Sequence, residues 1–409
     1  MPFESRASFK RLFPVVWLVA FFGLAFAGTS MTPPSTAALC TVTAAGWVFV
    51  LLALREEALQ IWQQQRALLI ATGLLELAIA VSEAASAYRG LAPPHPLLPQ
   101  SLLLACWPVL AIFLADANRM RAVVTVFCAV CAWHFFAMPI EAITGTKLSW
   151  HPVALLPRAA GPLNYQASGL AFQSYFFPGL FLPLFYLAWG PIYEGRVFPG
   201  LATRSAAMLA LPLIWLIPVA CVQSRSAFAG TLAAALLAII AAHPPRRWRA
   251  WLAAGLLVAS AALVYWVLFA QNKSGANLRL AYLELYLREA LDGHWILTGH
   301  GAYRDPGPPL TVPGTTPLEH SHNDFVQVLY SFGLPGLAAY LTFLAALVCL
   351  VRRNFTAKGE YWPACALVAL LPNMMTDLGI HHYEKAAFLV TFAAFCVAWS
   401  NLPSAKLKP

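Results

Sequence analysis

Apolar runs long enough to cross a lipid bilayer recur along almost the whole of this chain. A helix of roughly 17–25 apolar residues spans a hydrocarbon core of about 30 Å. The composition agrees, because 60% of the residues are apolar and 11% are charged, whereas soluble domains carry about 25% charged residues. A membrane β-barrel would need short alternating segments, and the sequence does not contain them. We therefore predict an all-α integral membrane protein.

The runs and the breaks between them predict about 12 transmembrane helices. We expect these helices at 12–30, 37–54, 67–88, 100–116, 122–139, 167–190, 205–222, 226–242, 250–270, 326–351, 361–378 and 386–401. Residues 1–270 would then contain helices 1–9, residues 271–325 one large loop, and residues 326–409 helices 10–12. Residues 140–166 form a second long connection on the same side as the large loop, and 55–66 a short connection on the opposite side.

Basic residues set the expected orientation of these helices. Cytoplasmic connections of membrane proteins are enriched in Lys and Arg, and most of the 26 basic residues fall in segments that are cytoplasmic if the N-terminus is. We therefore expect both termini in the cytoplasm and the large loop on the outer face. The net charge of +9 follows from this topology. We expect contact with membrane lipids and no nucleic-acid partner.

The large loop begins with an amphipathic segment, 277–291, which predicts a short helix. Asn277 is a suitable N-cap and Gly293 a stop signal. Helical spacing places Arg279, Tyr282 and Tyr286 along one face. A Pro- and Gly-rich segment follows, and the loop closes with the polar stretch 317–324, which runs directly into the apolar helix at 326–351.

His322 is the residue of that stretch best suited to chemistry. It lies at the start of the tenth helical region, where Asn323 or Asp324 can act as the N-cap. The positive end of the helix dipole disfavours an imidazolium ion, and a neutral imidazole accepts a proton at physiological pH. His322 is therefore a candidate general base. The alternative is a histidine that merely caps a helix at the membrane surface.

Three arginines on the same side form a candidate anion site. Arg158 lies in the connection 140–166, Arg225 in a short turn between two apolar runs, and Arg279 on the predicted loop helix. An arginine at the depth of Arg225 is costly unless it pairs with a carboxylate or binds a ligand. Guanidinium groups bind phosphate oxygens bidentately, so we expect a pyrophosphate site. The alternative is pairing with carboxylates such as Glu141 or Glu319, or with lipid head groups.

A metal site is the weaker interpretation of the histidines. Potential ligands are His300, His320, His322 and Asp324, but the zinc-binding HExxH pattern does not accompany them. We therefore expect neither a metal nor a cofactor.

The residues resemble a known family at this point. His322-Asn323, nine further residues and Gly333-Leu334-Pro335-Gly336 satisfy the pattern H-[NSQ]-x9-G-x2-[GTY] of the bacterial O-antigen ligases. The wider superfamily also contains O-antigen polymerases and protein O-oligosaccharyltransferases, and shares about twelve spans, cytoplasmic termini and one large periplasmic loop. The Ser224-Arg225 turn, the Arg279 helix and Gly299-His300-Gly301 are also similar to family positions.

The resemblance implies a metal-independent, inverting glycosyltransferase in the bacterial inner membrane, with its active site facing the periplasm. The donor would be a glycan on undecaprenyl diphosphate and the acceptor a sugar hydroxyl of lipid A-core. His322 would activate that hydroxyl, Arg225 and Arg279 would bind the departing pyrophosphate, and Arg158 would make a weaker donor contact. The expected supporting residues are Asn323, His320, Gly333, Gly336 and Tyr282.

Three alternatives stay open at the level of sequence. A protein O-oligosaccharyltransferase carries a similar histidine motif but is usually longer. An O-antigen polymerase would use a lipid-linked glycan as acceptor. A secondary transporter also suits twelve spans, but it predicts repeated halves and charges at the midplane, whereas the charges here cluster at the outer face.

Overall fold

The computed structural model describes residues 3–27, 33–90, 98–146, 148, 156–157, 165–166, 229–230, 232–234, 237, 273–301, 321–358, 362–376 and 383–401. The described helices are α1 (Phe3–Ala27), α2 (Pro33–Ala53), α3 (Arg55–Gln64), α4 (Arg66–Tyr88), α5 (Leu98–Leu114), α6 (Ala117–Thr144), α11 (Lys273–Ala290), α12 (Asp324–Lys358), α13 (Trp362–Thr376) and α14 (Tyr383–Asn401). The chain divides into two compact units. One contains Met1–Ala122, Arg279–Arg353 and Asp377–Pro409, and the other contains Val123–Leu278 and Asn354–Thr376.

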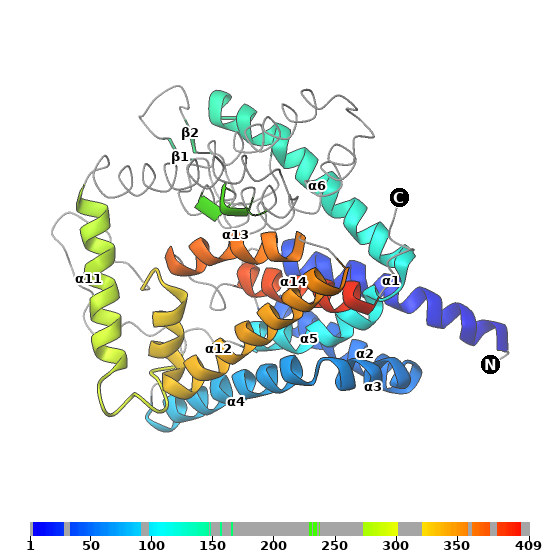
Figure 1. The fold of residues 1–409 in the computed structure, drawn as a ribbon, viewed down its shortest axis with the longest axis horizontal. Coiled ribbons are helices and arrows are strands. Elements are labelled where there is room, and N and C mark those ends of the chain that lie inside the picture. The colour runs from blue at the N-terminus through cyan, green and yellow to red at the C-terminus, as the bar shows by residue number, and fades with distance from the viewer. Residues whose placement is uncertain are drawn as a thin grey trace. The chain divides into compact units, whose positions relative to one another are not determined.

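Helix α5 is the centre of the first unit (Figure 1). Its sequence carries no charge, and a helix that is apolar on every side is typical of a buried position. Residues 106–114 are all buried, and the helix packs against α1, α2, α3, α4 and α14. Two tryptophans reinforce this packing, because Trp107 Nε1 donates to Thr72 Oγ1 at 2.9 Å and Trp47 Nε1 donates to the Ala105 carbonyl at 3.1 Å.

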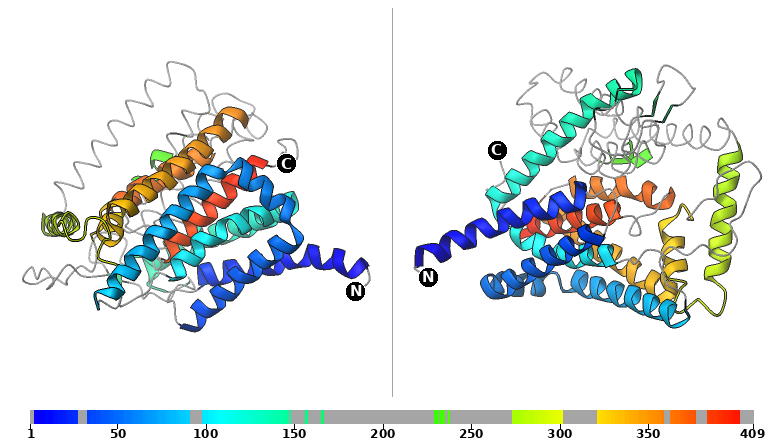
Figure 2. Two further views of the ribbon diagram at one scale, coloured as in Figure 1. Left: turned by 90° about the horizontal axis from the view of Figure 1, so that it is seen from below. Right: turned by 180° about the vertical axis from the view of Figure 1, so that it is seen from behind.

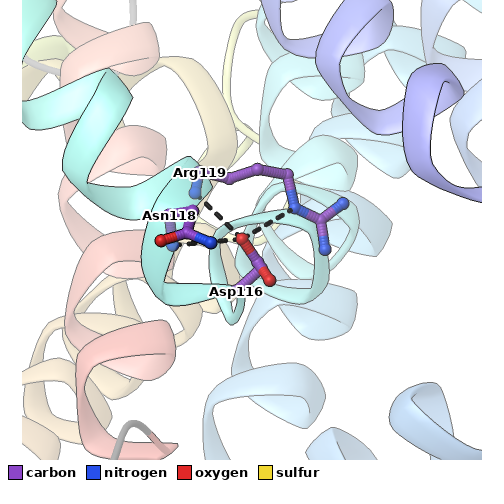
Figure 3. Close-up of polar contacts among 3 residues, drawn as sticks. All are labelled: Asp116, Asn118 and Arg119. Carbon is purple, nitrogen blue, oxygen red and sulfur yellow. Dashed lines mark hydrogen bonds and ion pairs between the residues drawn. The ribbon is translucent and has the colours of Figure 1, made fainter. Parts of the chain in front are cut away.

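A carboxylate marks the turn between α5 and α6. Asp116 Oδ1 accepts the backbone N–H groups of Asn118 at 3.1 Å and Arg119 at 2.9 Å (Figure 3). It also lies 3.7 Å from Arg119 Nε. These bonds satisfy donors in the first turn of α6, as an N-cap does, so the chain leaves α5 and starts a new helix within two residues.

Helices α4 and α12 lie side by side and run in opposite directions (Figure 2). Near one end, Ser82 Oγ donates to the Ser331 carbonyl at 2.5 Å. Near the other end, Arg353 Nη2 donates to Gln65 Oε1 at 3.2 Å. Helix α12 is itself in two parts, because Gly333 has φ 69° and ψ −172°, which are not helical angles. The short part before Gly333 stands at an angle to the long part after it (Figure 1).

The second unit contains α13, most of α6 and the two-residue strands β1 (Leu156–Pro157) and β2 (Tyr165–Gln166). The strands pair antiparallel, with Leu156 opposite Gln166. They lie in the predicted connection 140–166, where Leu148 N–H also donates to Glu141 Oε1 at 2.8 Å. Gly230 approaches the Ala369 carbonyl of α13 so closely that a Cβ atom there would collide with it.

The helical character and apolar helices fit an integral membrane protein, as predicted. Helices α1, α2, α4, α5, α6, α12, α13 and α14 overlap predicted spans. Within the described residues, four helices are long and apolar enough to cross a membrane, or five if α5 and α6 count as one span bent by 117°. Spans 167–190, 205–222 and 250–270 lie outside the described residues, and 226–242 lies largely outside them. The total of about 12 spans therefore stays a prediction.

Helix α3 is an element that the sequence analysis treated as a connection. It follows α2 with a single residue between them, and its first turn carries Glu56 and Glu57, which interact favourably with a helix N-terminus. Ile61 is its buried residue, whereas Leu59 and Trp62 are half exposed. Ten residues are too few to span a bilayer, so a search for long apolar runs does not detect this helix.

Candidate active site

The interruption of α12 removes partners from two backbone carbonyls. In a continuous helix the N–H of Leu334 would bond to the Tyr330 carbonyl, and the N–H of residue 335 to the Ser331 carbonyl. Residue 335 is proline and has no N–H, and the positive φ of Gly333 turns the chain away from the helical path. Buried backbone groups rarely stay unpaired, so these atoms need partners from elsewhere.

Residues 296–301 of the large loop supply these partners. His300 N–H donates to the Tyr330 carbonyl at 2.9 Å, and Gly301 N–H donates to the Ser331 carbonyl at 3.0 Å. In the opposite direction, Leu334 N–H donates to the Ile296 carbonyl at 2.7 Å. The segment 296–301 therefore replaces the missing helical bonds and joins the loop to α12.

Two glycines permit this close approach of two backbones, and a third permits a close contact within α12. A Cβ atom on Gly299 would collide with the Ser331 carbonyl, and one on Gly333 would lie 2.7 Å from the Ile296 carbonyl oxygen. A Cβ atom on Gly336 would collide with Phe332. Gly299 and Gly333 also have positive φ, which costs other residues strain. The spacing of Gly333 and Gly336 thus has a structural cause, which is the break in α12.

A stack of aromatic rings continues from the break to the neighbouring elements. Tyr330 lies edge-on to Tyr286 of α11, with 4.8 Å between ring centroids. The His300 ring stacks on Tyr330 and on Trp295, with 4.3 Å between centroids in both pairs. The guanidinium of Arg89, at the end of α4, lies 4.4 Å from the centre of the Trp295 ring. The stack ties α4, α11 and the loop to the short part of α12.

His322 occupies a tight turn just before the short part of α12. It is the one non-glycine residue with positive φ in the part of the chain that the structure describes, at 52°. Left-handed conformations of non-glycine residues cost roughly 1–3 kcal/mol and cluster at functional sites. The His322 side chain is half-buried. The turn at His322 therefore carries backbone strain of the kind that is common at functional sites.

Hydrogen bonds on both sides of His322 define the turn. Asn323 Oδ1 accepts the Val326 N–H at 3.1 Å, so Asn323 is the N-cap of α12. Ser321 N–H donates to Gln327 Oε1 at 3.0 Å, and Ser321 Oγ donates to the Asn323 carbonyl at 2.8 Å. His322 therefore directly precedes the N-cap of α12.

The sequence of this region matches a known family. Residues 208–341, about a third of the chain, match the family described as O-antigen ligase. The resemblance to the O-antigen ligase superfamily is confirmed. The family takes in O-antigen ligases, polymerases and oligosaccharyltransferases, and its members are glycosyltransferase-like enzymes that act on lipid-linked glycans. Comparison with the curated proteins gives no match.

The family match and the structure cover the predicted site residues unequally. The matched region includes all of them except Arg158, because it begins at residue 208. The structure describes His322, Asn323, Gly333, Gly336 and Tyr282, all in the first unit. Arg279 lies in α11, three residues before the buried Tyr282. Arg158, Arg225 and His320 lie outside the described residues, so their presence at the site stays a prediction.

Two features of the site were missed or placed differently by sequence reasoning. His300 is one of the potential metal ligands in the sequence, but its ring is stacked between Trp295 and Tyr330, and its Nδ1 lies 3.3 Å from the Tyr330 carbonyl. The Gly-His-Gly pattern was the available signal for this tight packing. Arg89 stacks on Trp295 and donates to Thr298 Oγ1 at 3.3 Å, and no local sequence pattern marks that contact.

Proposed function

We propose that this protein is an O-antigen ligase, which transfers an O-antigen glycan from undecaprenyl diphosphate to lipid A-core at the periplasmic face of the inner membrane. The observation that carries the proposal is His322, which has a left-handed backbone at the capped start of α12. It lies inside the region that matches the O-antigen ligase family. The match supports an enzyme acting on lipid-linked glycans, and the ligase role is our proposal within that family.

His322 would act as the general base of the transfer. Its neutral imidazole takes the proton of an acceptor hydroxyl, and the oxygen attacks the anomeric carbon of the donor sugar. The bond from that carbon to the pyrophosphate oxygen breaks as the new glycosidic bond forms, so the configuration inverts. Undecaprenyl diphosphate leaves with the electron pair of the broken bond.

The leaving group needs positive charge because the diphosphate gains a negative charge as the bond breaks. We propose that Arg225 and Arg279 bind this diphosphate, with Arg158 as a further donor contact. Paired guanidinium groups stabilise such charge strongly in a site with little water. Arg279 belongs to α11, the helix whose Tyr286 packs on Tyr330 of α12. The proposed donor-binding arginine and the proposed base would therefore lie on or next to two helices that are in contact.

The experiment that tests the function is a transfer assay with the purified full chain in detergent and a chelator. Undecaprenyl-diphosphate glycan is the donor, and the acceptor is lipid A-core, a pilin-like protein, or absent. We expect product on lipid A-core. Product on the protein alone would indicate an oligosaccharyltransferase, and elongated donor alone would indicate a polymerase, so either result would contradict the ligase proposal.

The His322→Ala variant tests the proposed base. We expect transfer to fall by at least about 100-fold, since a positioned general base contributes roughly 10²–10⁴-fold. The matched control is His294→Ala, because His294 is an exposed histidine on the same loop and should leave transfer unchanged. A folded His322→Ala variant with normal activity would remove the histidine from the mechanism.

A further inference from the structure

The two parts of α12 are joined by a buried side-chain contact across the break. Tyr340, in the long part, donates a hydrogen bond from its hydroxyl to Asp324 Oδ2 in the first turn of the short part. The two residues are 16 positions apart. A straight helix rises about 1.5 Å per residue, so they would be roughly 24 Å apart if α12 were continuous. The contact therefore exists only because the helix turns back at Gly333.

Both partners are fully enclosed. Asp324 and Tyr340 each have 0% of their surface exposed, and the Phe325 ring lies 6.1 Å from the Tyr340 ring. A buried carboxylate is costly unless it accepts hydrogen bonds, and a bond to a charged acceptor is about twice as strong as one between neutral groups. This contact therefore fixes the angle between the two parts of α12.

The contact also determines where His322 lies. Asp324 is two residues after His322 and directly follows the N-cap Asn323. The long part of α12 is anchored to α4 through Arg353 and Gln65. A bond from Tyr340 to Asp324 therefore connects the start of the short part to the long part that α4 anchors. We expect the turn at 321–323 to move if the bond is lost.

We propose that Tyr340 and Asp324 are positioning residues that orient His322 for transfer; this inference rests on the proposed function. They do not touch the substrate in this role. They act by keeping the base at the correct distance and angle, and a displacement of about 1 Å at a reacting group can cost about 100-fold in rate. The O-antigen ligase motif specifies neither residue, because Asp324 is the first of its nine unspecified positions and Tyr340 lies beyond Gly336.

The test compares Tyr340→Phe with a double variant, Tyr340→Phe/Asp324→Leu. The single variant removes the hydroxyl and keeps the carboxyl group of Asp324. The double variant removes both polar groups of the contact and replaces them by apolar ones. The control is Thr342→Val, because the Thr342 hydroxyl bonds to the Ala338 carbonyl of the same helix at 2.7 Å and is exposed. A separate variant, Asp324→Asn, keeps an acceptor for the Tyr340 hydroxyl. It should therefore retain part of the activity that the other two variants lose.

Two readouts separate this inference from the function on which it rests. The first is hydrogen–deuterium exchange of the purified protein, which needs no activity. We expect faster exchange at 321–328 in Tyr340→Phe and the double variant, and wild-type exchange in Thr342→Val. The second is transfer kinetics, in which we expect kcat to fall about 10-fold with the donor KM within about twofold of wild type.

Each outcome decides a separate claim. Unchanged exchange at 321–328 would overturn the proposal that the bond orients the turn. Faster exchange with normal kcat would overturn its role in catalysis. A wild-type chain that transfers no glycan to any acceptor would overturn the proposed function and with it the catalytic part, whereas the exchange result would still show whether the bond fixes the turn.

Discussion

Helices α5 and α12 both contain proline, yet one is continuous and the other is broken. Pro108 lies inside α5, which remains a single buried helix. Pro335 lies inside α12, where Gly333 adopts φ 69° and the chain changes direction. A proline removes one helical hydrogen bond, and neighbouring groups in a membrane protein compensate for that loss. The break in α12 therefore needs more than proline.

What α12 has in addition is a glycine and a second backbone that occupies the gap. The segment 296–301 makes hydrogen bonds to Tyr330, Ser331 and Leu334. In α5 the surrounding helices contribute side chains, such as Thr72 and Trp47. We infer that α5 is built for packing, whereas α12 exchanges helical bonds for tertiary ones in order to place His322.

The largest effect should come from Gly333→Ala. The new Cβ atom would meet the Ile296 carbonyl at 2.7 Å in a residue with positive φ, so we expect a loss of about 3 kcal/mol or more of stability and loss of transfer. The measurements are the apparent melting midpoint in detergent and the transfer assay. Gly73→Ala is the control, because nothing lies within 4 Å of that position. A Gly333→Ala variant as stable and active as Gly73→Ala would show that the glycine does not make the break.

A smaller effect is expected from Trp107→Phe in α5. The change removes the bond to Thr72 and part of a buried ring, which should cost about 2 kcal/mol without altering kcat of the folded protein. Thr72 still donates to the Leu68 carbonyl, so its hydroxyl does not lose its partner. Thermal unfolding and transfer kinetics measure the two quantities. A lower kcat in a normally folded variant would show that α5 also affects the site. It would contradict the inference that α5 serves packing alone.

The smallest effect should come from Pro335→Ala. Gly333 turns the chain off the helical path before residue 335, and the Ser331 carbonyl already accepts bonds from Gly301 and Ser82. We therefore expect no new helical bond, less than about 1 kcal/mol of change and transfer within about threefold of wild type. The matched change in α5 is Pro108→Ala, which adds one helical bond and should leave the melting midpoint equal or higher. Loss of activity in Pro335→Ala would mean that proline, and not Gly333 with its loop, maintains the break.

Sequence reasoning located most helices because apolar runs are local signals. Apart from α3, the described helices agree with the expected ones to within several residues. The exceptions are the starts of α1 and of the loop helix α11, which both lie earlier in the chain than expected. Arg55–Gln64 lacks the apolar length that the search required. The helical segment expected at 277–291 is present as α11, and its predicted face includes the buried residues Tyr282 and Tyr286.

The site was predicted in part for a similar reason. The motif identified His322, Asn323, Gly333 and Gly336 as belonging together, and the structure shows that the two glycines allow the break that follows the histidine. The contributions of His300, Arg89 and Tyr340 were not predicted. Their partners lie far away in the chain or across the break, and such contacts leave no periodic pattern.

The sequence by itself determined that this is a helical membrane protein. Hydropathy suffices for that, because each apolar helix satisfies its own backbone within the bilayer. The helix expected at 326–351 was predicted without the break that the structure shows at Gly333. Only the tertiary structure decided which groups complete the interruption, namely segment 296–301, Ser82 and the Tyr340–Asp324 bond. A broken helix leaves carbonyls that any nearby donor can satisfy, so the choice among distant donors depends on how the whole unit packs.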